Sequence, residues 1–123
     1  MGSWDKEPWG SDAAADWFAK VFEGIDIDSK IEKALEYYHD NYDVVRAAAF
    51  LLDVLGESYI WPGDLDKYEK HVQRALKILK AMIDENSDDE DMDFLELWDN
   101  DREVIASVES QIKSLEQKLK YAD

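Results

Sequence analysis

Apolar side chains recur every three or four residues along most of the chain, which is the spacing of one face of an α-helix. No stretch of four or more residues alternates between apolar and polar residues like a half-buried strand with turn signals around it. The pattern therefore predicts a compact all-α bundle of five or six helices, forming a single domain over residues 1–123. The predicted segments are 13–23, 29–39, 44–55, 65–84, a short helix or turn within 93–100, and 101–121.

The segment from Val44 to Leu55 is apolar nearly all round, with Arg46 and Asp53 as its charged members. A helix without a polar face usually lies at the centre of a bundle, so we expect this helix to be the central one. A buried carboxylate must be paired or neutralised. Asp53 therefore either emerges into water at the helix end or makes a polar contact with another helix.

Short polar side chains that can accept a hydrogen bond from a free backbone N–H stand at the predicted helix starts. Ser29 and Glu32 have the spacing of a capping box, and Asn41 and Asp64 precede the two following helices. Gly24 stands where the first helix should end, because glycine readily adopts a left-handed conformation. Within 101–121 the apolar residues follow the alternating four-three spacing of a helix seam.

The chain is strongly acidic: thirty acidic residues against fourteen basic ones give a formal net charge of −16. Such a surface repels phosphate, so we expect neither nucleic acid nor an anionic membrane as a partner. Ten acidic residues and no basic one lie in residues 84–101, which we call the acidic segment. This segment carries the strongest local field on the chain and favours a basic protein as partner.

A second charged surface is predicted on the helix 65–84. Its basic residues fall opposite the apolar arc of the helix and should face solvent. They are Lys67, Lys70, Arg74, Lys77 and Lys80. Two interpretations remain open: this basic face is either solvated or paired with the acidic segment, or it is a docking patch.

One stretch of the acidic segment resembles a calcium-binding loop. Asp89, Asp91 and Asp93 match the first ligand positions of such a loop. The loop also needs a glycine at its sixth position and a bidentate glutamate at its twelfth, where this chain has Phe94 and Asn100. We interpret the stretch as a solvated acidic loop, with a weak divalent-cation site as the alternative.

Other motifs that carry chemistry are incomplete. Glu36 and His39 have the Glu-x-x-His spacing of di-iron bundles, but the second copy that such bundles need is missing. The chain has no cysteine, no Gly-x-Ser-x-Gly turn and no glycine-rich phosphate loop. We therefore predict no metal, no cofactor and no catalytic residue, which argues against an enzyme.

Tryptophans crowd the start of the chain, at Trp4, Trp9 and Trp17, and Trp61 stands in a predicted loop. Large aromatic rings contribute strongly to core burial, so one interpretation is an N-terminal aromatic arm that folds onto the helices. The other is an aromatic anchor surface for a partner, because tryptophan is enriched at binding hot spots.

The chain opens Met1-Gly2-Ser3-Trp4 and continues Pro8-Trp9-Gly10-Ser11-Asp12-Ala13-Ala14-Ala15-Asp16-Trp17. This opening resembles that of a family of small bacterial proteins, domain of unknown function family 4259. The resemblance extends to the Ala-rich segment 44–55 and to Glu96-Leu97-Trp98-Asp99. It implies a bacterial, helical protein and carries over no catalytic residue, because the family has no established activity. The matching positions are Trp4, Trp9, Asp12, Asp16, Trp17 and Trp98.

These observations predict a non-enzymatic, acidic protein-binding module that masks a basic partner, as an immunity or antitoxin-like protein would. The alternative is an enzyme or a small-ligand sensor with an unrecognised carboxylate site. The start of the chain lacks a signal-peptide pattern and no apolar run could span a bilayer, so we expect a cytoplasmic monomer or simple homodimer. The candidate partner-binding residues are Trp4, Trp9, Asp12, Asp16, Trp61, Asp88, Asp89, Glu90, Asp91 and Trp98.

Overall fold

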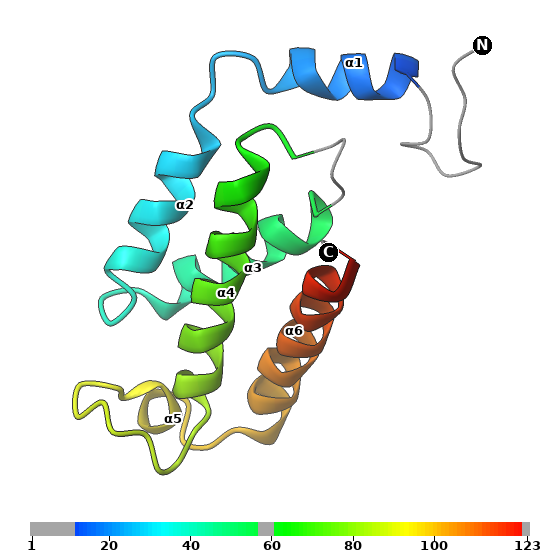
Figure 1. Cartoon of the computed structure of the whole chain (residues 1–123). Helices are drawn as coiled ribbons and strands as arrows, with labels where there is room; N and C mark the ends of the chain where they lie inside the picture. Colours follow the sequence, from blue (N-terminus) through cyan, green and yellow to red (C-terminus); the bar gives the residue numbers. More distant parts are fainter. Residues whose placement is uncertain (1–11, 57–60, 122–123) are drawn as a thin grey trace.

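The computed structural model describes residues 12–56 and 61–121, which form six helices and no strand (Figure 1). The all-α fold class predicted from the sequence is therefore confirmed. None of the described helices combines the length and the apolar content needed to cross a lipid bilayer. The helices are α1 (Asp12–Val21), α2 (Ile27–Glu36), α3 (Tyr42–Val54), α4 (Leu65–Met82), α5 (Phe94–Leu97) and α6 (Arg102–Tyr121).

Helix α4 packs against α2, α3 and α6 and supplies more buried side chains than any other described helix. Helix α6 lies along α3 and α4 and buries Val108, Ile112 and Leu115. These three residues belong to the predicted helix seam, which the packing of α6 confirms. Burial of such apolar surface is the main term that holds the bundle together.

Helix α3 packs against α2, α4 and α6, as expected of the central apolar helix. Its inward face buries Val45, Ala48, Ala49 and Leu52. The opposite face remains exposed although it is also apolar. Its large exposed side chains are Val44, Phe50, Leu51 and Val54, which are between 38% and 62% exposed.

Three of the predicted helix boundaries depend on caps. Asn41 accepts a hydrogen bond from the backbone N–H of Val44, and Asp64 accepts one from Asp66, so both predicted caps are confirmed. The capping box at Ser29 is wrong, because α2 begins earlier, at Ile27. Its cap is Asp26, which accepts hydrogen bonds from the backbone N–H and the hydroxyl of Ser29.

Polar side chains cross the contact between α3 and α6. The hydroxyl of Ser114 donates to the Asp53 carboxylate, at 2.8 and 2.9 Å from its two oxygens. Arg46 donates to Gln111 and to Ser107. Neither placement predicted for Asp53 holds in full, because its side chain is 30% exposed and also makes a polar contact with another helix.

Helix α1 lies across one end of the molecule, and the acidic segment lies at the other end with α5 (Figure 1). Gly24 follows α1 with a φ of +80°, the left-handed conformation expected at a helix end. The exposed side chains of α1 include Trp17, which is 61% exposed. The first residues of the predicted aromatic arm lie outside the described part of the chain.

Candidate functional site

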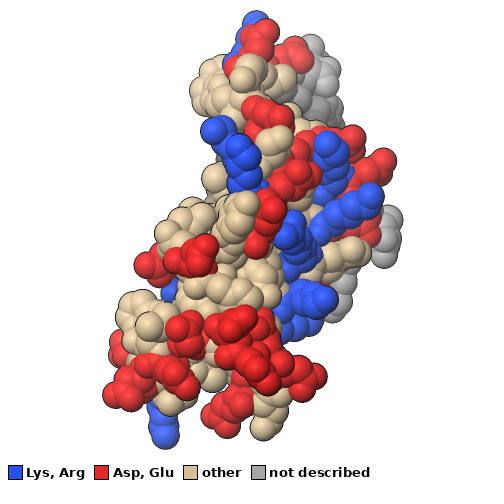
Figure 2. Space-filling view, turned by 90° about the vertical axis from the view of Figure 1, so that its left-hand side faces the viewer, with Lys and Arg blue, Asp and Glu red and all other residues tan. Residues whose placement is uncertain are grey.

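Acidic side chains gather at the end of the molecule formed by α5 and the loop before it, and this end is red in Figure 2. Every acidic side chain of the acidic segment except Asp89 is exposed. None of the five basic side chains of α4 makes an ion pair with this segment within 4.0 Å, and Lys80 instead lies 3.7 Å from Glu116 of α6. The basic face is exposed as predicted, but its pairing with the acidic segment is wrong, because its side chains lie beside α2, α6 and solvent.

Asp89 holds the acidic segment against the end of α2. Its Oδ2 lies 2.7 Å from Nε2 of His39 and accepts a hydrogen bond from the hydroxyl of Tyr38 at 3.1 Å. The hydrogen bond from His39 holds the pKa of the Asp89 carboxyl below its ordinary value. Asp89 is therefore half-buried and has a structural role, so its prediction as a solvated loop residue is wrong, whereas its role in partner binding stays a prediction.

A second anchor lies at the start of α5. The hydroxyl of Tyr42 donates to Oδ1 of Asp93 at 2.8 Å and accepts from the backbone N–H of Asp93 at 3.2 Å. Phe94 is fully buried next to Tyr42, in an edge-to-face contact with a centroid distance of 5.4 Å. These contacts fix α5 against α3, so the acidic surface has a defined shape.

The acidic segment contains a pocket of about 410 Å³. Its apolar lining comes from Met82, Met92 and Leu95, and Met82 is fully buried. Its polar lining consists of Asp84, Glu85, Ser87, Asp89, Glu96 and Asn100. The pocket thus combines apolar side chains with four carboxylates. Within the described residues no group of three acidic, histidine or cysteine side chains is placed to hold a metal ion.

Two large apolar side chains are exposed in the acidic segment, close in sequence to the lining residues of this pocket. Leu97 is 65% exposed and Trp98 is 43% exposed, at the end of α5. The chain then turns sharply, because Asp99 and Asn100 both have left-handed φ angles of 51° and 54°. Aspartate and asparagine adopt this conformation more readily than other non-glycine residues, because their short polar side chains can form local hydrogen bonds.

A buried histidine–aspartate pair connects α2 to α4. Nε2 of His71 lies 2.9 Å from Oδ1 of Asp28, and Oδ2 of Asp28 accepts from the backbone N–H of Asp64 at 3.0 Å. The side chains of His71 and Asp28 are 5% and 12% exposed. Sequence reasoning missed this pair, because the two residues are 43 positions apart and neither belongs to a recognisable motif.

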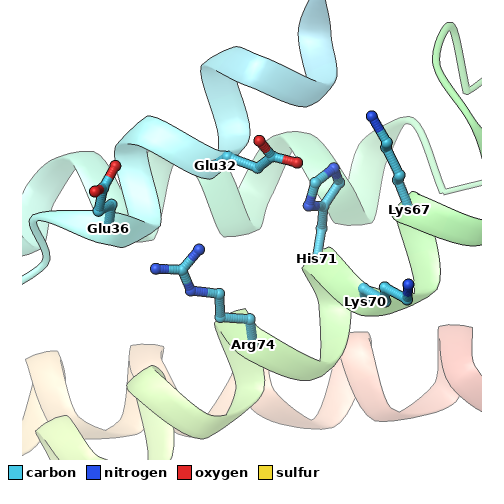
Figure 3. Close-up of a pocket in the computed structure, with 6 residues that line it drawn as sticks. All are labelled: Glu32, Glu36, Lys67, Lys70, His71 and Arg74. Atoms are coloured by element: carbon cyan, nitrogen blue, oxygen red, sulfur yellow. The ribbon is translucent and has the colours of Figure 1, made fainter.

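His71 also lines a pocket of about 370 Å³ between α2 and α4 (Figure 3). Its other lining residues are Glu32 and Glu36 from α2 and Lys67, Lys70 and Arg74 from α4. The predicted Glu36–His39 step does not converge on one site, because Glu36 lines this pocket while His39 lies beyond the end of α2 and contacts Asp89.

The structure does not bring the remaining candidate residues together. Trp4 and Trp9 lie outside the described residues, and Asp12 and Asp16 belong to α1, at the opposite end from the acidic segment. Trp61 is only 6% exposed, because its ring packs against Tyr68 at a centroid distance of 4.9 Å. Its prediction as a partner-binding residue is therefore wrong.

Compared with models of known protein families, with curated proteins and with solved structures, the chain shows no significant match. The family resemblance noted in the sequence therefore stays a prediction. The features of this structure that bear on function are the two pockets and the surfaces around them, because function depends on specific sites rather than on the fold.

Proposed function

We propose that the protein is a non-enzymatic module that binds a basic protein through the acidic segment. In this proposal it acts in the cytoplasm of a bacterium and masks a positively charged surface of its partner, as an immunity or antitoxin-like protein would. The partner meets the acidic end of the molecule, around α5, rather than the end that carries α1.

The observation that carries the proposal is the pocket of the acidic segment. A lysine or arginine side chain has a long apolar stem and a cationic tip, and it buries the stem while its tip stays at a polar edge. The pocket offers Met92 and Leu95 to such a stem and Asp84, Glu85 and Glu96 to the tip. An acidic surface that served solubility alone would not need an apolar lining.

The exposed pair Leu97 and Trp98 supports the same surface. Tryptophan is enriched among the residues that contribute most to protein–protein binding, and such residues are typically surrounded by polar ones. Acidic residues stand on both sides of Trp98 in the sequence, including Glu96 and Asp99, and both are exposed. Opposite charge accelerates encounter with a basic partner, and burial of Trp98 then slows dissociation.

The test replaces three exposed acidic residues of the segment, Asp88→Asn, Glu90→Gln and Asp91→Asn, and leaves Asp89 in place. The matched control removes the same charge elsewhere, with Glu23→Gln, Glu69→Gln and Glu109→Gln, which are also exposed. The probe is an immobilised lysine- and arginine-rich peptide in a surface-plasmon-resonance experiment, and the same comparison applies to any partner captured later.

The segment variant should associate several-fold more slowly than the control at low salt. The difference should fade as salt shortens the screening length from about 10 Å at 0.1 M to about 3 Å at 1 M. Trp98→Ala should instead speed dissociation. Equal association rates for the two triple variants would mean that net charge alone attracts the probe, and the proposal would be abandoned.

A further inference from the structure

One ring nitrogen of His71 is left without a partner although the side chain is buried. Asp28 occupies Nε2, and no described residue forms a hydrogen bond with Nδ1. A carboxylate only accepts hydrogen bonds, so Nε2 donates in this contact. Nδ1 keeps contact with solvent, because Nε1 of Trp61 is the one enclosed side-chain nitrogen or oxygen without a partner among the described residues. The His71 ring lies at the edge of the pocket in Figure 3.

One wall of this pocket is acidic and the other is basic, and in the described part of the chain no ion pair joins the two walls. Glu32 and Glu36 come from α2, and Lys67, Lys70 and Arg74 come from α4. Among the described residues, none of the five takes part in an ion pair within 4.0 Å. Figure 3 shows the Glu32 carboxylate close to the His71 ring and the Arg74 side chain reaching toward α2.

We propose that this pocket binds a small zwitterion, a molecule such as a free amino acid that carries both a carboxylate and an ammonium group. A simple anion would be repelled by Glu32 and Glu36, and a simple cation by the three basic side chains, whereas a zwitterion satisfies both walls. The volume of about 370 Å³ lies at the small end of the range for ligand pockets.

The side chains divide into a donor side and an acceptor side. Arg74 and Lys70 donate to the ligand carboxylate, and the planar guanidinium of Arg74 suits a two-pronged contact with it. Glu32 and Glu36 accept from the ligand ammonium group. Asp28 is a positioning residue, because its hydrogen bond with Nε2 fixes the His71 ring at the edge of the pocket. This site lies apart from the acidic segment and does not depend on the proposed partner.

The test is a nitrogen-15 NMR titration of the whole chain, followed at the His71 ring and at the backbone amides of α2 and α4. The probes are glycine, β-alanine and 4-aminobutyrate, whose charged groups lie at increasing separation, with acetate, methylammonium and inorganic phosphate as controls that carry charge of one sign only, at constant ionic strength. At least one amino acid should saturate the His71 signal with a dissociation constant in the millimolar range or tighter. Each control should bind about tenfold more weakly than that amino acid, because each satisfies one side only.

Variants at exposed positions distinguish the site from a general charge effect without disturbing the core. Arg74→Gln and Glu32→Gln should each weaken binding about tenfold, since each removes one charge-assisted hydrogen bond. The matched controls Lys77→Gln and Glu69→Gln, also exposed on α4, should bind as the unaltered protein does. Saturation by phosphate or acetate at lower concentrations than any amino acid would show an anion site and overturn the proposal. So would the absence of saturation by every amino acid, or equal binding by the Arg74→Gln and Lys77→Gln variants.

Discussion

Nε2 of His39 lies 2.7 Å from Oδ2 of Asp89, and this contact joins the end of α2 to the acidic segment across 50 residues of chain. Together with the bond between Tyr42 and Asp93, it fixes the most charged part of the molecule at two points. Like charges in one segment repel each other, so a segment of this composition would tend to extend without such anchors. The anchors keep the pocket and Trp98 in one defined surface.

The contact between His39 and Asp89 predicts a loss of stability in acid. The pKa of Asp89 is lowered from its ordinary value of 3.8, chiefly by the hydrogen bond from His39. A carboxyl whose pKa is lower in the folded state stabilises the fold above its ordinary pKa, and this stabilisation disappears as the pH falls through the lowered value. Asp89→Asn should therefore reduce the urea midpoint at pH 6, and the difference from the unaltered protein should shrink as the pH falls below the ordinary value of 3.8.

The exposed neighbour Asp88 provides the control for this prediction. It makes no hydrogen bond through its side chain among the described residues, so Asp88→Asn should change the urea midpoint little at either pH. A difference between Asp89→Asn and the unaltered protein that stayed constant with pH would show that the Asp89 carboxylate is not the titrating group.

The raised pKa of Tyr42 predicts a loss of stability in alkali. Burial of the phenol, together with the hydrogen bond to the Asp93 carboxylate, raises the pKa of Tyr42 from 10.0 to about 12. An acid with a raised pKa in the folded state stabilises the fold below its ordinary pKa, and this stabilisation is lost as the pH rises from about 10 to about 12. At about 1.4 kcal/mol per pKa unit, the loss is on the order of 2 to 3 kcal/mol.

A phenolate absorbance titration checks this assignment. Tyr42→Phe should remove a titration step near pH 12, whereas Tyr37→Phe should leave that step in place, because the Tyr37 side chain is 62% exposed. If the step near pH 12 persisted in the Tyr42→Phe variant, another tyrosine would have to be its source.

Adjacent leucines on α3 offer a matched test of the packing. Leu52 is fully buried, and Leu51 is 38% exposed on the outward face of the same helix. Leu52→Ala should lower the free energy of unfolding by roughly 2 to 5 kcal/mol, because it leaves a cavity among α3, α4 and their neighbours. Leu51→Ala should lower it by about 1 kcal/mol or less. Equal losses in urea titrations would mean that the outward face of α3 is covered in solution.

The helices could be predicted from the sequence because their signal is local. The spacing of apolar residues within one segment determines which face is buried, as Val108, Ile112 and Leu115 show in α6. The exposure of one face of α3 could not be predicted in this way. A helix with apolar residues on all sides can be buried on all sides. Whether it is buried there depends on how many helices pack against it, which the sequence of that helix does not determine.

The contacts that define both pockets depend on residues far apart in the chain. Asp89 meets His39, and Asp28 meets His71, only because α2 and α4 pack side by side. A single sequence contains no periodic signal for such pairs. The exposure of Trp61 was predicted wrongly for a related reason. The neighbouring Pro62-Gly63 pair is typical of an exposed loop, whereas the Trp61 ring packs against Tyr68 and His71.

Gly63 lies so close to the Asp28 carboxylate that a larger residue at position 63 should disturb the buried histidine–aspartate pair. A Cβ atom at position 63 would lie 2.8 Å from Cγ of Asp28 and still closer to Oδ2, which is too short for real contacts. The carboxylate cannot move away without losing its hydrogen bonds to His71 and to the backbone of Asp64. Gly63→Ala should therefore lower the free energy of unfolding by about 1 to 3 kcal/mol, the cost of leaving buried polar groups unpaired.

A double-mutant cycle with Asp28→Ala separates this mechanism from a general effect of the added methyl group. Each single substitution should destabilise the protein, because each disrupts the bond to His71. In the Asp28→Ala background the three atoms nearest to the added methyl group are gone, so Gly63→Ala should have little further effect. The coupling energy from urea titrations should thus nearly equal the loss caused by Gly63→Ala alone. Strictly additive losses would show that the methyl group acts on some other neighbour, and that Gly63 is not required by the position of Asp28.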